Sequence, residues 1–160
     1  MSAQVAAIPG IPIANHRSED ELPFVKFTEG IEFQLMQVDI DLGLWIVRTK
    51  FVPGTTIQRH HHTGMVFAYT TSGAWRYLEY PAINTPGSYL HEPAGSIHTL
   101  HALADTDGLT DVFFAIYGAN LNLDDDGNVE SILDAGVVLD LYLKECEEAG
   151  LARPNVIGTK

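Results

Sequence analysis

The sequence has few cysteines and few basic residues, and it lacks long hydrophobic segments. Cys146 is the only cysteine among 160 residues, so the chain cannot form an intramolecular disulfide or a cysteine-rich metal site. No apolar run approaches the roughly 20 residues that a membrane-spanning helix needs. Nine lysines and arginines against 21 acidic residues give a net charge of −12. This charge disfavours nucleic acid and anionic membranes, and we expect neither as a partner.

The N-terminal segment lacks both a periodic pattern and the basic stretch that opens a secretory signal peptide. Pro9, Gly10 and Pro12 also interrupt its apolar part. We therefore expect a cytoplasmic protein. A chain of 160 residues suits one domain, so we predict an arm over residues 1–22 and a single domain over residues 23–160.

Short β-rich runs begin at Gly30 and are separated by glycine and proline. Several short strands at nearly regular spacing, with turn residues between them, are typical of an all-β sandwich or barrel. The predicted strands lie within IEFQLMQVDI, LWIVRTKFV, MVFAYTT, AWRYLEY, SYLHE, HTLHAL and DVFFAIYG.

The pattern changes after the acidic stretch at residues 124–128, which we interpret as a solvated Asp-Gly turn rather than a calcium loop. The apolar residues beyond it recur at helical spacing. Asp134 is a suitable N-cap and Gly150 a suitable stop, so we predict a helix over about residues 134–149 whose apolar stripe packs on the core. The apolar residues of this pattern are Ile132, Leu133, Val137, Val138, Leu141 and Tyr142.

Three consecutive histidines occur in the stretch RHHHTG. On a strand, alternate side chains face opposite sides, so His60 and His62 would share one face and His61 would face away. Such a pair is either a metal chelate or two surface histidines. A third histidine from another strand would favour the metal. Imidazole suits iron, zinc, copper and nickel, so the ligand type leaves the metal open. The candidates for the third ligand are His91, His98 and His101, the last two having opposite strand parity.

Two spaced motifs resemble those of the cupin superfamily. In the first, Gly54 is followed after five residues by His60 and then His62. In the second, Gly87 is followed after five residues by the sequence PAG and, two residues later, by His98. The resemblance implies a double-stranded β-helix, which is a jelly-roll barrel, here with a C-terminal α-helix. It also implies that His60, His62 and His98 bind one divalent metal.

The first motif of cupins usually carries a glutamate ligand, but Val66 or Phe67 occupies that position here. With Trp45 and the segments SGAWRYLEY and YLHEPAGSIHTL, this departure resembles the three-histidine cupins related to 2,4′-dihydroxyacetophenone dioxygenase and acetylacetone dioxygenase. That resemblance implies an Fe(II)-dependent enzyme that uses O2 to cleave a carbon–carbon bond of a β-diketone or an α-hydroxyketone, an aryl ketone such as a dihydroxyacetophenone. Zinc, nickel or another metal remains an alternative for a purified sample. Cupins also imply a homodimer or larger homo-oligomer.

The same resemblance bears on four further residues. Glu92 corresponds to a glutamate that hydrogen-bonds near the metal, although a solvated glutamate at a strand end is the alternative. Trp45, Val66 and Phe67 either line an apolar pocket or fill the core. The alternative functions are a zinc-binding sensor or small-molecule-binding cupin without catalysis, and a metal-free structural cupin.

Overall fold

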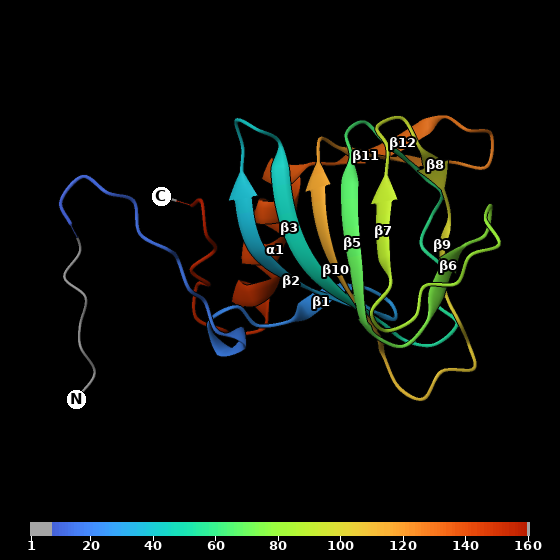
Figure 1. The fold of residues 1–160 in the computed structure, drawn as a ribbon, viewed down its shortest axis with the longest axis horizontal. Helices are drawn as coiled ribbons and strands as arrows, with labels where there is room; N and C mark the ends of the chain where they lie inside the picture. The colour runs from blue at the N-terminus through green and yellow to red at the C-terminus, as the bar shows by residue number, and fades with distance from the viewer. Residues whose placement is uncertain (1–7, 160) are drawn as a thin grey trace.

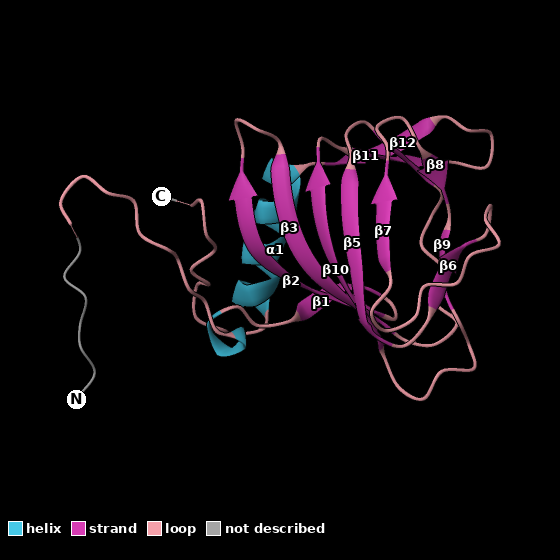
Figure 2. Cartoon of the chain, viewed as in Figure 1, coloured by secondary structure: helices cyan, strands magenta, loops and turns pink. Residues whose placement is uncertain are grey.

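The computed structural model describes residues 8–159, which form three antiparallel sheets and one C-terminal helix (Figures 1 and 2). The largest sheet has the order β1 (Val25–Thr28), β2 (Ile31–Asp39), β3 (Leu44–Phe51), β10 (Thr110–Tyr117), β5 (Val66–Ser72) and β7 (Tyr89–Glu92). A four-stranded sheet has the order β12 (Val129–Leu133), β11 (Asn120–Leu123), β4 (His60–His62) and β8 (Ile97–His98). The third sheet pairs β6 (Trp75–Tyr77) with β9 (Leu100–Ala102). The predicted all-β fold with a C-terminal helix is confirmed.

Strand β3 shows how the sequence forms the core. Its residues alternate between buried and half-buried positions along the whole strand, as expected for a sheet with one face against an interior. Trp45, Val47, Thr49 and Phe51 point inward. Strand β10 lies beside β3 in an unbroken register and adds further buried side chains, including Phe114. These inward residues of the large sheet form one wall of the interior.

The helix α1 (Ala135–Glu148) agrees with its predicted limits. The Asp134 side chain accepts a hydrogen bond of 2.9 Å from the backbone N–H of Val137, which satisfies one of the free donors at the helix start. Its buried face packs on β1 and β2, and the Tyr142 hydroxyl donates a 2.7 Å hydrogen bond to the carbonyl of Pro23. Within residues 8–159, the helical residues are too few and too polar to span a membrane.

A hairpin of β11 and β12 precedes the helix, and this part of the sequence prediction was wrong. Ile132 and Leu133 belong to β12, although they continue the apolar spacing of the helix. The turn between the two strands contains the acidic stretch, where the Asp124 side chain accepts hydrogen bonds from the backbone N–H groups of Asp126 and Asn128. This hairpin extends the sheet that carries β4.

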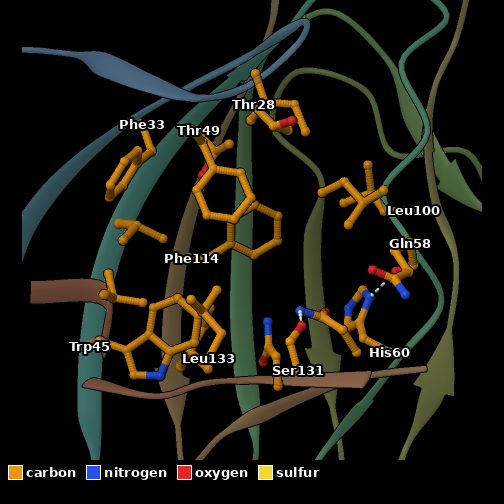
Figure 3. Close-up of a pocket in the computed structure, with 18 of the residues that line it drawn as sticks. Thr28, Phe33, Trp45, Thr49, Gln58, His60, Leu100, Phe114, Ser131 and Leu133 are labelled. Carbon is orange, nitrogen blue, oxygen red and sulfur yellow. Dashed lines mark hydrogen bonds between the residues drawn. The ribbon is translucent and has the colours of Figure 1, made fainter. Parts of the chain in front are cut away.

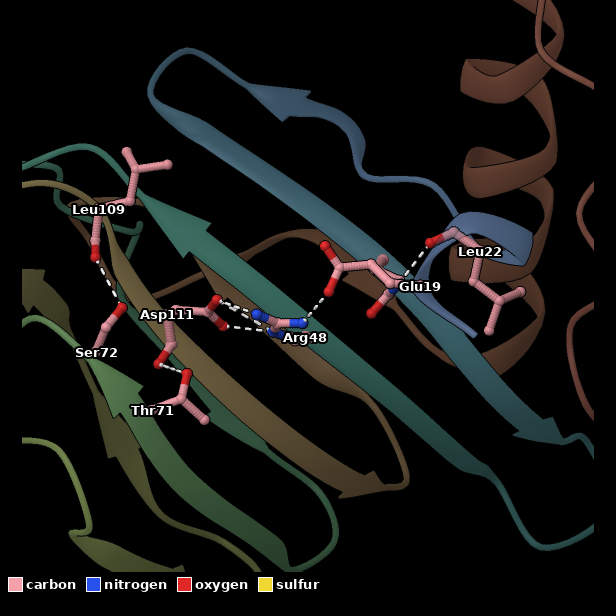
Figure 4. A network of polar contacts seen from close by, with 8 residues as sticks. Glu19, Leu22, Arg48, Thr71, Ser72, Leu109 and Asp111 are labelled. Carbon is pink, nitrogen blue, oxygen red and sulfur yellow. Dashed lines mark hydrogen bonds and ion pairs between the residues drawn. The ribbon is translucent and has the colours of Figure 1, made fainter. Parts of the chain in front are cut away.

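The segment before β1 runs along the outside of the molecule, and residues 8–16 extend away from the sheets (Figure 1). A 3₁₀ helix, η1 (Glu19–Glu21), follows. The Arg48 guanidinium on β3 bonds both carboxylate oxygens of Asp111, and its Nη1 lies 2.7 Å from Glu19 Oε2 (Figure 4). The hydrogen bonds that Arg48 donates to the Asp111 carboxylate raise the pKa of Arg48. This network joins η1 to the outer face of the large sheet.

Candidate metal centre

Strands β4 and β8 bring three histidines together. His60 and His62 are 5% and 3% exposed, whereas His61 between them is only half-buried. His60 lies directly opposite His98 in the antiparallel pair of β4 and β8. Side chains at opposite positions of such a pair project from the same face. Strand parity and register thus place His60, His62 and His98 on one face and leave His61 outside the group.

The three imidazoles converge on one point. One ring nitrogen from each histidine lies within 4.8 Å of one ring nitrogen of the other two. The ring centroids are 4.7 Å apart for His60 and His62, 5.2 Å for His60 and His98, and 5.1 Å for His62 and His98. All three side chains are buried. Imidazole nitrogens at this separation can hold one transition-metal ion.

Two of the rings are oriented by their neighbours. His60 Nδ1 lies 2.9 Å from the carbonyl oxygen of Gln58. A carbonyl only accepts, so Nδ1 carries the proton and Nε2 keeps a free lone pair for a metal. The His98 ring stacks on Tyr77 with a centroid distance of 3.7 Å and an interplanar angle of 12°. These contacts hold His60 and His98 in orientations suited to coordination.

The third ring faces Asn120. In the pairing of β4 with β11, Asn120 lies directly opposite His62. Among residues 8–159, the buried atoms His62 Nδ1 and Asn120 Oδ1 have no hydrogen-bond partner. A buried polar atom is normally paired, so these two atoms are the natural partners of each other. Asn120 Oδ1 is thus placed to accept a hydrogen bond from His62 Nδ1 and to orient this ring, as the Gln58 carbonyl orients the His60 ring.

Glu92 lies closer to the centre than the sequence suggested. Its Oε2 atom is 3.0 Å from His62 Nε2 and 3.2 Å from His98 Nε2, and its side chain is buried. The Tyr77 hydroxyl donates a hydrogen bond to Oε1. Glu92 is therefore not a solvated strand-end residue. Its second oxygen is directed at two of the nitrogens that would bind a metal.

The protonation states of His60, His62 and Glu92 favour the binding of a cation. Burial lowers the pKa of His60, and burial lowers the pKa of His62 to about 3 despite the opposing influence of Glu92. Both rings are thus neutral near pH 7, the form that binds metals. Burial alone would raise the pKa of Glu92, but the proximity of His98 and His62 outweighs it and lowers the pKa.

An anionic oxygen buried beside neutral rings is costly unless a positive charge is near. Among the described residues 8–159, neither Glu92 Oε2 nor His98 Nε2 has a hydrogen-bond partner. A divalent ion bound by the three histidines would offset the charge of this carboxylate and give His98 Nε2 a partner. The residues present therefore fit a divalent metal.

The metal centre borders a large cavity of about 650 Å³ between the sheets and α1 (Figure 3). His60, His62 and Tyr77 form part of its wall. Phe33, Trp45 and Leu133 lie on the side away from His60, as Figure 3 shows. Most of the remaining wall is apolar, with side chains from β1, β2, β3, β10, β12 and α1. The arrangement places polar ligand atoms at one end of a mostly apolar chamber.

The structure separates the three residues proposed to line a pocket. Trp45 lines the cavity, and its indole Nε1 donates a 3.0 Å hydrogen bond to the carbonyl of Gly118. Val66 is buried opposite Glu92 but does not line the cavity. Phe67 has the opposite strand parity, so its side chain lies on the outer face of the sheet and packs on His91, with ring centroids 5.4 Å apart. The structure thus places only Trp45 in the cavity wall.

Sequence reasoning missed Tyr77 and Asn120. Tyr77 was not among the predicted site residues, yet it is 3% exposed and contacts both His98 and Glu92. The available signal was its position two residues after Trp75 on β6, which places both side chains on the same, buried face. Asn120 had no comparable signal, because its role depends on the pairing of two strands that are distant in the chain.

Comparisons with known proteins agree with this fold. The model of a family described as ChrR cupin-like domain matches residues 15–114. A crystal structure of a protein of unknown function with a cupin-like fold from Ralstonia eutropha is 33% identical, with a TM-score of 0.83 over 92% of this chain and 97% of that chain. The search of curated proteins found no match.

Two more distant structures share the fold alone. An acetylacetone dioxygenase from Acinetobacter johnsonii is 17% identical, with a TM-score of 0.72 over 91% of this chain and 99% of that chain. The structure of Rhodobacter sphaeroides SigE in complex with the anti-sigma ChrR gives 14% identity and a TM-score of 0.52, over 62% of this chain and 52% of that chain.

Proposed function

The chain belongs to the family of ChrR cupin-like domains, and from its three buried histidines we propose that it is a metal-dependent dioxygenase. The proposed reaction cleaves a carbon–carbon bond of a β-diketone or α-hydroxyketone with O2, and Fe(II) is the proposed metal. One observation carries the proposal. Three buried imidazoles meet beside the Glu92 carboxylate, and two of them, those of His60 and His62, line an apolar cavity large enough for an organic substrate.

A divalent ion held by His60, His62 and His98 would acidify a bound ketone and allow its enolate to react with O2. Because the three imidazoles are neutral and the Glu92 carboxylate offsets only part of the double charge of the ion, the site favours an anionic oxygen donor such as an enolate. The apolar walls keep water away from the reacting carbon.

Glu92 is suited to take up the proton that the ketone loses. Its Oε1 accepts the hydrogen bond of Tyr77, which leaves Oε2 directed at the histidine nitrogens. Its lowered pKa keeps Glu92 in the carboxylate form near neutral pH, as a general base requires. Tyr77 holds both this carboxylate and the His98 ring in place.

The products follow from the balance of atoms. Cleaving one carbon–carbon bond of a β-diketone and adding both atoms of O2 yields a carboxylic acid and an α-ketoaldehyde. An α-hydroxyketone treated in the same way yields two carboxylic acids. The ketone is oxidised and O2 is the only oxidant needed.

The test is O2 consumption by protein loaded anaerobically with Fe(II), measured with β-diketones and with 2-hydroxyacetophenones. With ¹⁸O2 as substrate, we expect both labelled atoms in the two products together. His61→Ala provides a matched control on the same strand and should retain activity, whereas His98→Ala should lose it. Iron-loaded protein that consumes no O2 with either class of ketone would refute the proposal.

A second candidate is a zinc-binding sensor without catalysis, and the match to ChrR cupin-like domains supports it. The three histidines would then hold zinc, and the cavity would receive a regulatory small molecule. Tightly bound zinc, a ligand-dependent change in hydrogen exchange at the cavity walls, and no O2 consumption after iron loading would favour the sensor over the enzyme.

A further inference from the structure

The cavity has two chemically different parts. His60 lies on one side, and Phe33 and Trp45 lie on the other, with Phe114 between (Figure 3). His62, whose ring centroid is 4.7 Å from that of His60, also lines the cavity. A ligand that fits both parts needs oxygen donors at one end and an apolar group at the other.

The size of the cavity argues for a large apolar group. Its volume of about 650 Å³ falls within the range of pockets that enclose drug-sized ligands, which is roughly 300 to 1,000 Å³. A diketone with two methyl ends would contact the histidines and leave most of the chamber unfilled. Apolar walls offer few hydrogen bonds to water, so water would fill the remaining space poorly. A larger apolar group would fill it better.

The amide donors of Gln58 and Asn122 in the wall do not change this conclusion, because other protein groups already accept hydrogen bonds from them. Gln58 Nε2 donates to the carbonyl of Leu123 at 2.8 Å and contacts Glu130. Asn122 Nδ2 donates to Ser131 Oγ at 3.0 Å. These donors place no demand on a ligand, so the apolar walls decide what fits beyond the metal centre.

Two exposed apolar residues mark the opening. Ile132 on β12 and Val137 on α1 both line the cavity, yet they are 53% and 46% exposed. A residue that lines a cavity and is also half exposed lies at its rim. An apolar rim favours the passage of an apolar group and is otherwise unfavourable in water.

We propose that the ligand of this cavity is a ketone bearing a bulky apolar substituent, either an aryl ring or an alkyl group of similar volume. Its oxygens face His60 and His62, and its substituent lies between Phe33, Phe114 and Trp45. Val137 is a specificity-determining residue at the opening. The chelating head group rests on the proposed function, whereas the apolar part of the site stands without it.

The experiment has a metal-independent arm and a metal-dependent arm. In the first, the neutral fluorescent dye phenylnaphthylamine is titrated into metal-free wild type, Val137→Trp and Val129→Trp. Val129 is the matched control, because it is 52% exposed on β12 and does not line the cavity. In the second, acetylacetone and benzoylacetone are titrated by calorimetry into the Zn(II)-loaded proteins, since zinc permits binding without oxidation.

We expect the dye to bind wild type and Val129→Trp alike, and Val137→Trp about tenfold more weakly or worse because the indole fills the opening. Benzoylacetone should bind wild type about tenfold or more tightly than acetylacetone, since a phenyl ring replaces a methyl group in an apolar site. The Val137→Trp variant should lose this preference.

Equal dye binding by the two tryptophan variants, or no binding by wild type, would overturn the inference, as would equal affinity for the two diketones. Failure of the proposed function is recognised separately. Dye binding that depends on Val137, together with no O2 consumption after iron loading, would remove the dioxygenase and leave the apolar site standing. O2 consumption without a preference for benzoylacetone would support the dioxygenase and overturn the inferred apolar site.

Discussion

The two parts of the cavity wall are built in different ways. The histidine part depends on strand register, because His60, His62 and His98 meet only if β4 and β8 pair as they do. Its polar atoms require specific partners, such as the Gln58 carbonyl and the Tyr77 hydroxyl. The apolar part depends on volume and hydrophobicity, and no single hydrogen bond determines it.

This difference separates chemistry from recognition. Substitutions at the histidine part should change metal binding and turnover by large factors, because buried polar groups lose specific partners. Substitutions at the apolar part should change which ligand binds, and by smaller factors, because apolar contacts are individually weak. Each of the following experiments changes one part and asks whether the other responds.

Among substitutions that should leave the metal bound, Glu92→Gln is expected to have the largest effect on turnover. The amide has the shape of the carboxylate but cannot accept the proton of the ketone, so turnover should fall by about 100-fold or more. Fe(II) content and the affinity for phenylnaphthylamine should change much less. Steady-state O2 consumption and metal analysis on the same samples measure this. Turnover equal to that of wild type would remove Glu92 as the base.

A smaller effect is expected for Asn120→Leu, which takes away the proposed partner of His62 Nδ1. Metal affinity should fall by about tenfold, since partners that orient a ligating imidazole typically contribute this much. The matched control is Asn122→Leu on the same strand. It lies opposite His60, whose Nδ1 already has the Gln58 carbonyl. Competition with a chromophoric chelator measures both, and equal losses would contradict the role of Asn120.

The metal-free protein should lose stability as the pH falls. Burial lowers the pKa of His62 to about 3 in the folded state. In the unfolded chain a histidine titrates near about 6.5, so below that pH the unfolded state binds a proton that the folded state does not. Between about pH 7.5 and about pH 5.5, His62 alone should reduce the free energy of unfolding by about 1 kcal/mol.

Urea denaturation at the two pH values measures this loss for wild type and His62→Asn. The variant lacks the titrating ring, so its unfolding free energy should depend less on pH. An identical pH dependence for the two proteins would show that His62 is not held neutral by burial.

The smallest effect is expected on the helix side of the molecule. Tyr142→Phe removes the hydrogen bond to the Pro23 carbonyl and should lower the free energy of unfolding by about 1 kcal/mol. Tyr142 does not line the cavity, so metal and dye affinities should match those of wild type. Thermal unfolding with parallel titrations tests this, and a change in metal affinity would show that the contact between Tyr142 and Pro23 is coupled to the metal centre.

The sequence allowed much of the fold and the grouping of the histidines to be predicted. Alternation along a strand separates His60 and His62 from His61, and the glycine and proline turns locate most strands. The hairpin of β11 and β12 was missed because Ile132 and Leu133 continue the helical spacing of α1. A periodic pattern does not show where a strand ends and a helix begins.

The surroundings of the histidines were less predictable. Tyr77 and Asn120 act through contacts between strands far apart in the chain, which depend on register and not on local pattern. Phe67 was expected to line the pocket or fill the core, although its strand parity relative to buried Val66 and Ala68 directs it outward. Parity along β5 would have given the correct placement.

The central claim is that one metal ion is bound by His60, His62 and His98. Its most direct test is the metal content of wild type, His98→Ala and His61→Ala purified from the same host and measured by mass spectrometry. We predict about one transition-metal ion per chain for wild type and His61→Ala, and nearly none for His98→Ala. Equal metal content in wild type and His98→Ala would contradict the claim.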